Sequence, residues 1–163
     1  MTTKKSSFPA ITAPNARVLI LGSLPGEASL AAGHYYAHPR NAFWPIVSQL
    51  LGIDLLALDW PVRYTALQKH GIALWDVVGR AERAGSLDAA LRNVAANPLG
   101  QLVATLPELR CVAFNGGTAA RIGQRQLLDH PVAKLALPST SPAHTLPFAS
   151  KFASWSALSD YLR

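Results

Sequence analysis

Residues 17–26 read "RVLILGSLPG", and this stretch decides the fold class. Its first part, Arg17–Leu21, is an apolar run that is too short for a helix and is followed by a glycine, which predicts a buried strand. Three further runs of this kind follow along the chain, each bounded by Gly, Pro or Asn: Ile72–Val77, Arg110–Phe114 and Ala133–Leu137. Strands that are apolar throughout are typical of a parallel sheet covered on both faces.

Helical patterns lie between and after these strands. The predicted helices are 41–51, 62–70, 86–96 with Ser86 as its cap, 98–106, 116–127, and a last helix with an apolar stripe from Phe148 to Leu162. Alternating strands and helices predict an α/β fold, a three-layer α/β/α sandwich around a mainly parallel four-stranded sheet. The length of 163 residues suits one domain, residues 1–163, and we expect residues 1–14 to be poorly ordered.

Composition narrows the class of protein. Half of the chain is hydrophobic, 15% is charged, and the net charge of +6 suits a polyanionic partner, although the basic residues form no dense run. The chain has neither a secretory signal pattern nor an apolar run of membrane-spanning length. The single cysteine, Cys111, excludes an internal disulfide and a four-cysteine iron–sulfur cluster. We therefore expect a cytoplasmic monomer that does not contact a membrane.

Three unusual loops follow three of the four predicted strands: "GSLPGE", "NGG" and "PSTSPAHT". Ligands of parallel sheets bind beyond the carboxyl ends of the strands, so these loops should converge on one edge. The first loop lacks the Gly-Lys-Ser/Thr ending of a phosphate-binding loop and also lacks Gly-x-Gly-x-x-Gly. Nucleoside triphosphate hydrolysis and dinucleotide binding therefore have no support, and a tight turn explains this loop equally well.

An aromatic segment, "AAGHYYAHPRNAFWPIV", follows the first loop. Tyr35 and Tyr36 lie between a glycine and a proline, so they belong to a loop, where aromatic rings either pin the chain or stack on a planar ligand. His34 and His38 are four residues apart, but the flanking glycine and proline argue against a helix and no third ligand is present. We therefore expect no metal site here.

Two polar segments suit nucleic-acid chemistry. The carboxamide of Asn115 offers a donor and an acceptor side by side, which matches the carbonyl and N–H edge of uracil or hypoxanthine and opposes that of adenine. Ser139, Thr140 and Ser141 lie between two prolines, and such a stiff hydroxyl-bearing loop suits phosphate contacts or entry into a minor groove. An ordinary Asn-Gly turn and an ordinary Pro-Ser turn are the alternatives.

In this order and spacing, the segments resemble the uracil-DNA glycosylase superfamily, from about residue 17 to residue 146. "GSLPG" stands in the place of its first motif, "YYAHPRNAFWP" is similar to the aromatic–His-Pro-x-Asn–Phe-Trp segment of the mismatch-specific branch, and "LPSTSPAHT" is similar to the second motif. The best match is the hypoxanthine-DNA glycosylase branch, through "GSLPGE", "YYAHPRN", "LWDV", "GSLD", "FNGGTA" and "LPSTSPA". Leu24 departs from the mismatch-specific branch, which has a water-positioning Asn in that slot.

The resemblance implies a monofunctional DNA N-glycosylase of base-excision repair, without lyase activity, metal or cofactor. It would flip a deaminated base, most of all the hypoxanthine of deoxyinosine, out of DNA and cleave its bond to the sugar. The implied catalytic residues are Asn41 and His144. The implied base-binding residues are Tyr36, Asn115, Gly22, Ser23 and Leu24, and the implied DNA-binding residues are Pro25, Ser139, Thr140, Ser141, Pro142 and Ala143.

Several alternatives stay open at this point. Asp76 and Glu27 are further candidates for the site, each equally explained as a surface or helix-start acid. Ala143, His144 and Leu146 are each possible wedges into the duplex. The alternative functions are a mismatch-specific uracil or thymine glycosylase, a non-catalytic nucleic-acid-binding module, and a hydrolase of free nucleosides.

Overall fold

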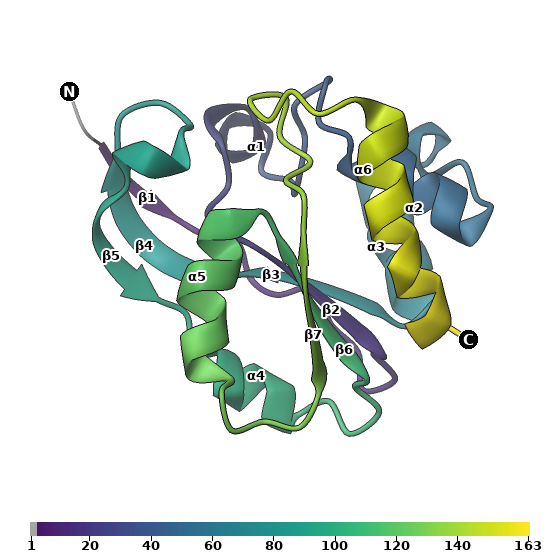
Figure 1. Cartoon of the computed structure of the whole chain (residues 1–163). Coiled ribbons are helices and arrows are strands. Elements are labelled where there is room, and N and C mark those ends of the chain that lie inside the picture. The colour runs from purple at the N-terminus through teal and green to yellow at the C-terminus, as the bar shows by residue number, and fades with distance from the viewer. Residues whose placement is uncertain (1–2) are drawn as a thin grey trace.

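The computed structural model describes residues 3–163, and its centre is a four-stranded parallel sheet (Figure 1). The strands lie in the order β3-β2-β6-β7, and every neighbouring pair is parallel. Their bounds agree with the four predicted strands to within one residue at each end: β2 (Val18–Gly22), β3 (Ile72–Asp76), β6 (Cys111–Asn115) and β7 (Ala133–Leu137). The predicted four-stranded sheet is therefore confirmed.

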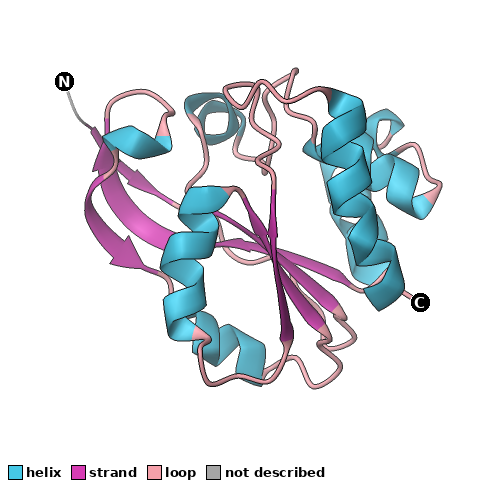
Figure 2. Cartoon of the chain, in the orientation of Figure 1, coloured by secondary structure: helices cyan, strands magenta, loops and turns pink. Residues whose placement is uncertain are grey.

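Helices cover both faces of this sheet, as Figures 1 and 2 show. Helices α4 (Leu99–Ala104) and α5 (Gly117–Gln126) lie on one face. Helices α2 (Phe43–Leu51), α3 (Trp60–Lys69) and α6 (Phe148–Trp155) lie on the other. These five fall within predicted helices except at the start of α3, so the α/β/α sandwich is confirmed.

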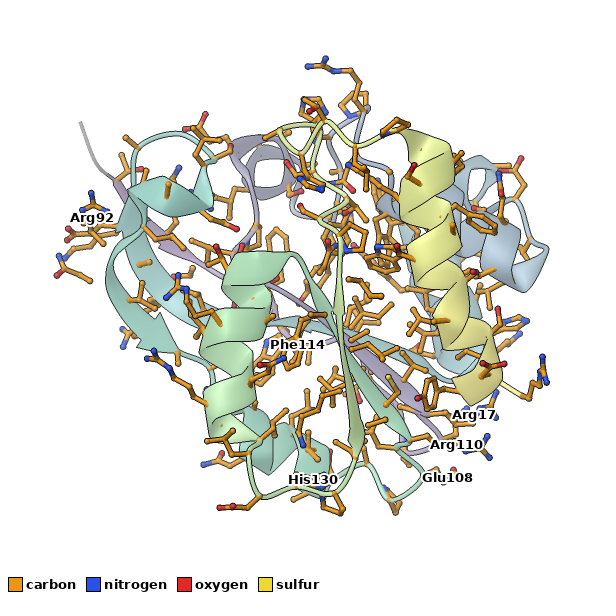
Figure 3. All side chains as sticks on the ribbon, in the orientation of Figure 1. Arg17, Arg92, Glu108, Arg110, Phe114 and His130 are labelled. Atoms are coloured by element: carbon orange, nitrogen blue, oxygen red, sulfur yellow. The ribbon has the colours of Figure 1, made fainter. Side chains whose placement is uncertain are left out.

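Alternation along the strands builds two cores. In β2, Leu19 and Leu21 are buried on the side of α4 and α5, whereas Val18 and Ile20 are buried on the side of α2, α3 and α6. Phe114 in β6 lies under α5 (Figure 3) and packs against Gly123, where an added Cβ would come 2.5 Å from its ring. Both faces of the sheet are therefore buried, which is why its strands are apolar throughout.

A second, antiparallel sheet has no counterpart in the predicted strands. It has the order β1-β4-β5, with β1 (Thr3–Ser6), β4 (Val78–Arg83) and β5 (Arg92–Ala96). The sequence predicts poor order for residues 1–14, but residues 3–6 pair with β4. The same expectation for Met1 and Thr2 lies outside the described residues. All five side chains of β5 are exposed, so no apolar pattern marks this strand.

The predicted helix 86–96 is wrong. The structure has a short 3-10 helix, η2 (Asp88–Ala90), followed by strand β5. The Ser86 hydroxyl accepts a hydrogen bond from the Glu27 N–H, 2.9 Å away, instead of capping a helix of its own. Strand β5 pairs with β4 instead of continuing a helix. A helical pattern without an apolar face gains little from packing and is therefore easily replaced by strand pairing.

The remaining short elements complete the layers. They are α1 (Glu27–Ala32), η1 (Leu55–Ala57) and η3 (Ser156–Tyr161), the last of which continues α6. Helix α1 ends at Gly33, whose φ of 73° is a left-handed conformation that glycine adopts without strain. The loops that follow β2, β6 and β7 lie at the same end of the main sheet (Figure 1). The strand order reverses between β2 and β6, which is where ligands of such sheets bind.

Candidate active site

A pocket of about 200 Å³ lies at this carboxyl edge of the sheet. Its walls come from the loops after β2, β6 and β7, the segment between α1 and α2, and the turn that leads into η2. Every predicted site residue lines it except Pro142, the neighbour of Ser141. Of the two undecided acids, Asp76 lines the pocket, whereas Glu27 points outward to Lys5, with 3.4 Å between its Oε1 and the lysine Nζ.

The side chain of Asn115, at the end of β6, is held by Thr140. The Thr140 backbone N–H donates to Asn115 Oδ1, and Asn115 Nδ2 donates to Thr140 Oγ1, both over 2.9 Å. Because a backbone N–H can only donate, it fixes which end of the amide is oxygen. Asn115 and Thr140 are only 8% and 1% exposed, so water does not compete with this pair. Thr140 therefore takes up the donor and the acceptor that lie side by side on the amide, and the remaining N–H and lone pair point away from each other.

The side chain of Asn41 is fixed in the same way. Its Oδ1 accepts a hydrogen bond from the Phe43 backbone N–H, 2.9 Å away, at the start of α2. The next residue, Ala42, donates its backbone N–H to the carbonyl oxygen of Thr140 over 3.0 Å. Thr140 therefore joins the two segments that carry the carboxamides, and both amides face one pocket with their orientation set by backbone donors.

Thr140 has a contact that the sequence did not predict. The resemblance implies a DNA contact for it together with Ser139 and Ser141, and in the structure its hydroxyl accepts from Asn115 Nδ2 while its N–H donates to Asn115 Oδ1. The residue is buried and positions Asn115. Ser139 and Ser141 are only partly buried and line the pocket, and their hydroxyls accept the backbone N–H groups of Ser141 and Ala143.

The two tyrosines have different surroundings. Tyr35 is buried, donates its hydroxyl to the carbonyl oxygen of Pro9 over 3.0 Å, and accepts the Trp44 indole N–H at its own carbonyl. It therefore pins the loop. Tyr36 has a φ of 53°, which strains a non-glycine residue, and its ring stacks on Phe43 with 4.2 Å between ring centroids. Burial raises the pKa of both hydroxyls above the ordinary value.

Asp76 and the Tyr36 hydroxyl meet below Gly22. A Cβ placed on Gly22 would lie 2.7 Å from Asp76 Oδ1 and 2.8 Å from Tyr36 Oη, so only glycine fits at this position. Asp76 is 2% exposed, and burial raises the pKa of its carboxyl to about 7. The nearby negative charge of Asp88 adds to this rise in pKa, and the positive charge of Arg83 opposes it.

The second sheet holds the first loop in place. Arg83 in β4 is fully buried and donates to the carbonyl oxygens of Pro25, 2.6 Å away, and of Gly85, 2.9 Å away. Leu24 is buried in the core on the side of α4 and α5 while it lines the pocket. The slot in which the mismatch-specific branch has a water-positioning Asn therefore offers only an apolar surface here.

Most of the pocket residues that sequence reasoning missed lie at the start of η2 and directly before it. Ser86, Leu87 and Asp88 line the pocket, and Asp88 Oδ1 accepts the Ser23 hydroxyl over 2.7 Å. The string "GSLD" was a signal for this segment, but its serine reads equally as a helix cap. Ser29 and Tyr35 also line the pocket without being predicted.

The two histidines of the aromatic segment, His34 and His38, have different contacts. The ring of His34 stacks on Trp60 with 4.4 Å between centroids and shares a hydrogen bond with the Tyr64 hydroxyl, while His38 Nδ1 accepts the Arg40 N–H. Within residues 3–163, no group of three or more His, Cys, Asp or Glu side chains is placed to hold a metal ion. His144 is exposed at the rim of the pocket.

The loop after β7 rests on a buried lysine. Lys151 in α6 is 4% exposed and donates its ammonium to the Ser141 carbonyl oxygen, 3.1 Å away, and burial lowers the pKa of this ammonium. The same carbonyl accepts the backbone N–H of His144 over 3.0 Å. A positive charge therefore lies directly beneath the loop that carries Ser139 and Ser141.

Fold and site together define an α/β protein whose sheet-edge pocket presents two carboxamides with fixed orientation. The family model described as the uracil DNA glycosylase superfamily matches residues 9–162, and the chain belongs to this superfamily.

Two curated relatives are named hypoxanthine DNA glycosylase. The one from Methanosarcina barkeri is 38% identical over 113 residues, which are 69% of this chain and 72% of the relative. The one from Methanosarcina acetivorans is 32% identical over 154 residues, 94% and 97% of the two chains. A solution structure of a candidate uracil DNA glycosylase from Methanosarcina acetivorans superposes with a TM-score of 0.88 at 31% identity, covering 98% of this chain and 99% of the other. No helix among the described residues has the length and hydropathy to cross a membrane.

Proposed function

We propose that this protein hydrolyses the N-glycosidic bond of deaminated bases in DNA, with hypoxanthine as its main substrate. The observation that carries this proposal is the Asn115 amide, whose orientation is fixed by the backbone N–H of Thr140. The superfamily membership and the two relatives named hypoxanthine DNA glycosylase support the same reaction.

Fixing the amide is what allows it to discriminate between bases. Hypoxanthine presents a carbonyl oxygen next to a ring N–H, so its carbonyl oxygen can accept the Nδ2 N–H of Asn115 that Thr140 leaves over. Adenine presents an amino group next to an unprotonated nitrogen, the opposite pattern. A freely rotating amide would turn over and accept both bases, whereas one fixed by Thr140 offers its remaining N–H to a carbonyl oxygen and not to the amino group of adenine.

The remaining chemistry is base flipping and cleavage of the glycosidic bond. Flipping costs a few kcal/mol, least at a mispaired base, and cleavage leaves positive charge on the sugar and negative charge on the base. Fixed dipoles around the pocket stabilise both charges. Asn41 does not accept a proton near neutral pH, but its fixed oxygen keeps a lone pair that can orient a water below the sugar. Tyr36 supplies an aromatic surface for the base.

The DNA backbone would lie over the loop after β7. Ser139, Ser141 and the His144 side chain offer hydrogen bonds to phosphates at the rim of the pocket. Arg17 and Arg110 do not belong to this surface, because they lie at the opposite end of the main sheet (Figure 3) and donate to the carbonyl oxygens of Leu162 and Arg163.

In the decisive experiment, the protein is incubated with duplex oligonucleotides that carry one deoxyinosine, one deoxyuridine or only normal bases. The products are then treated with hot alkali, which breaks the strand wherever a base has been removed. Strand breakage with deoxyinosine above all is the expected result. Breakage with deoxyuridine alone would instead support a uracil glycosylase, whose substrate shares the same edge pattern. No breakage on any duplex would contradict catalysis and leave a nucleic-acid-binding module.

Lys151→Met should weaken duplex binding and flatten its salt dependence. Methionine keeps most of the buried stem but removes the charge beneath the loop after β7. If that charge neutralises one phosphate, the log–log slope of affinity against salt should become less negative by about 0.9. Binding is measured by fluorescence anisotropy with a labelled duplex. Lys69→Met is the matched control, since Lys69 is exposed on α3, and it should leave the slope unchanged. An unchanged slope in Lys151→Met would remove this lysine from the DNA surface.

A further inference from the structure

The carboxyl of Asp76 has no hydrogen bond that accounts for its burial. Its Oδ2 is sealed from solvent and has no partner among the described residues, and the same is true of the Tyr36 hydroxyl. Asp76 nevertheless lines the pocket, with its Oδ1 beside Gly22. Buried polar groups without partners are rare in folded proteins and ask for an explanation. A ligand in the pocket is the explanation that the geometry offers.

The Arg83 guanidinium offsets only part of the cost of a charge on this carboxyl. Two of its nitrogens donate to the carbonyl oxygens of Pro25 and Gly85, while Nη1 has no hydrogen-bond partner among the described residues and lies 3.8 Å from Asp88. The other groups that face Asp76 are Asp88 from η2 and the hydroxyls of Tyr35 and Tyr36, none of which carries positive charge. A buried carboxylate that is only partly compensated is costly, so the group keeps its proton up to about pH 7 and is then a hydrogen-bond donor.

The sheet places this donor opposite the Asn115 amide. Gly22 pairs in register with Asp76 on one side, and its own strand β2 pairs with β6, which ends in Asn115, on the other. Two inter-strand spacings, about 10 Å, therefore separate Asp76 from Asn115 across the sheet. Gly22 has no side chain in this interval, which holds the Tyr36 hydroxyl, 2.8 Å from where a Cβ would lie. A planar base that enters the pocket and moves this hydroxyl aside meets the amide along one edge and the carboxyl along another.

We propose that Asp76 is a further catalytic residue, a general acid that protonates a ring nitrogen of the departing purine. This rests on the proposed function. The bond between C1′ and N9 breaks, and its electron pair passes to the purine. The Asp76 proton moves to N3 or N7, so hypoxanthine leaves as a neutral molecule. The oxygen of a water bonds to C1′, and the proton that this water releases returns through solvent to the Asp76 carboxylate.

The test is the pH dependence of single-turnover excision from a deoxyinosine duplex. The wild-type rate should fall as pH rises through about 7, the pKa to which burial raises the Asp76 carboxyl. Asp76→Asn keeps the shape but carries no transferable proton, so its rate should drop about 10²–10⁴-fold and lose the alkaline fall. Asp76→Glu should keep the fall. Asp129→Asn, at an exposed aspartate, is the matched control with a wild-type profile.

Unfolding supplies a readout that is independent of activity. A folded-state pKa near 7 and an unfolded value near 3.9 mean that the folded protein binds more protons between these values. Stability from Asp76 is therefore present below about pH 4 and is lost as pH rises to about 7. The urea midpoint of the wild type, relative to that of Asp76→Asn, should decline over this range.

The outcomes separate this inference from the proposed function. A wild-type protein that cleaves no deoxyinosine duplex at any pH contradicts the proposed function itself. A wild-type rate that rises through pH 7 would make Asp76 a general base, and a fall retained in Asp76→Asn would give the titration to another group; either result overturns the inference. His144 also lines the pocket, so the profile is repeated in His144→Gln, where the fall should remain.

Discussion

Asn115→Ala is expected to lower the single-turnover rate of deoxyinosine excision by about 10²–10³-fold, the loss typical for one fixed donor at a developing negative charge. The alanine removes both the Nδ2 donor and the Oδ1 acceptor that face the pocket. It also leaves the Thr140 N–H and hydroxyl without their partner. The measurement is the rate at saturating enzyme, which separates the chemical step from DNA binding.

Two further variants test the reason for this effect. Thr140→Val keeps Asn115 and the backbone N–H but removes the hydroxyl that holds Nδ2. We expect it to lose selectivity against adenine more than it loses rate on deoxyinosine. Asn15→Ala is the matched control, because Asn15 is exposed and far from the pocket lining, and its rate should equal that of the wild type. A wild-type rate in Asn115→Ala would contradict the assignment of the base-reading residue.

Asn41→Ala should produce the second large loss, again about 10²-fold or more, because a misplacement of about 1 Å in a reacting group has an effect of this size. The Asn41 oxygen, held by the Phe43 N–H, would no longer orient the attacking water. The excision rate at saturating enzyme measures the loss, and affinity for the duplex should change much less.

The same substitution also removes a hydrogen bond at the start of α2, which stabilises such a helix by about 0.5–2 kcal/mol. Asn41→Asp separates the two effects, since a carboxylate oxygen can still accept the Phe43 N–H. Urea unfolding should show near wild-type stability for Asn41→Asp and a lower midpoint for Asn41→Ala. If Asn41→Ala excises deoxyinosine at the wild-type rate, the water must be positioned elsewhere in the pocket.

Much of the fold was predictable because it follows from local patterns of apolar residues. The strands β2, β3, β6 and β7 are buried on both faces, so their apolar runs are visible in sequence and their ends lie within one residue of the prediction. The second sheet was not predictable in this way. The exposed strand β5 carries no apolar signal, and it forms because β4 offers it hydrogen bonds across the intervening turn.

The residues of the candidate site also fall into those that the sequence could predict and those that it could not. Asn115 stood out because a carboxamide matches the edge of a deaminated base, Asn41 stood out through the resemblance of its segment to the superfamily, and both line the pocket. Thr140 could not be recognised as the partner of Asn115 from a run of Ser and Thr between prolines. Asp88 was hidden because "GSLD" reads as a helix start, while its contact with Ser23 spans 65 residues of sequence.

The sequence by itself determined the α/β class, the central sheet, the superfamily and the chemical character of the groups at the sheet edge. These follow from side-chain polarity and from spacing along the chain, which require no knowledge of long-range contacts. Only the tertiary structure decided which way each amide faces, and that the Asp76 carboxyl is buried without a partner beside Gly22. Orientation and burial depend on backbone donors and walls contributed by distant segments, and no local stretch of sequence contains that information.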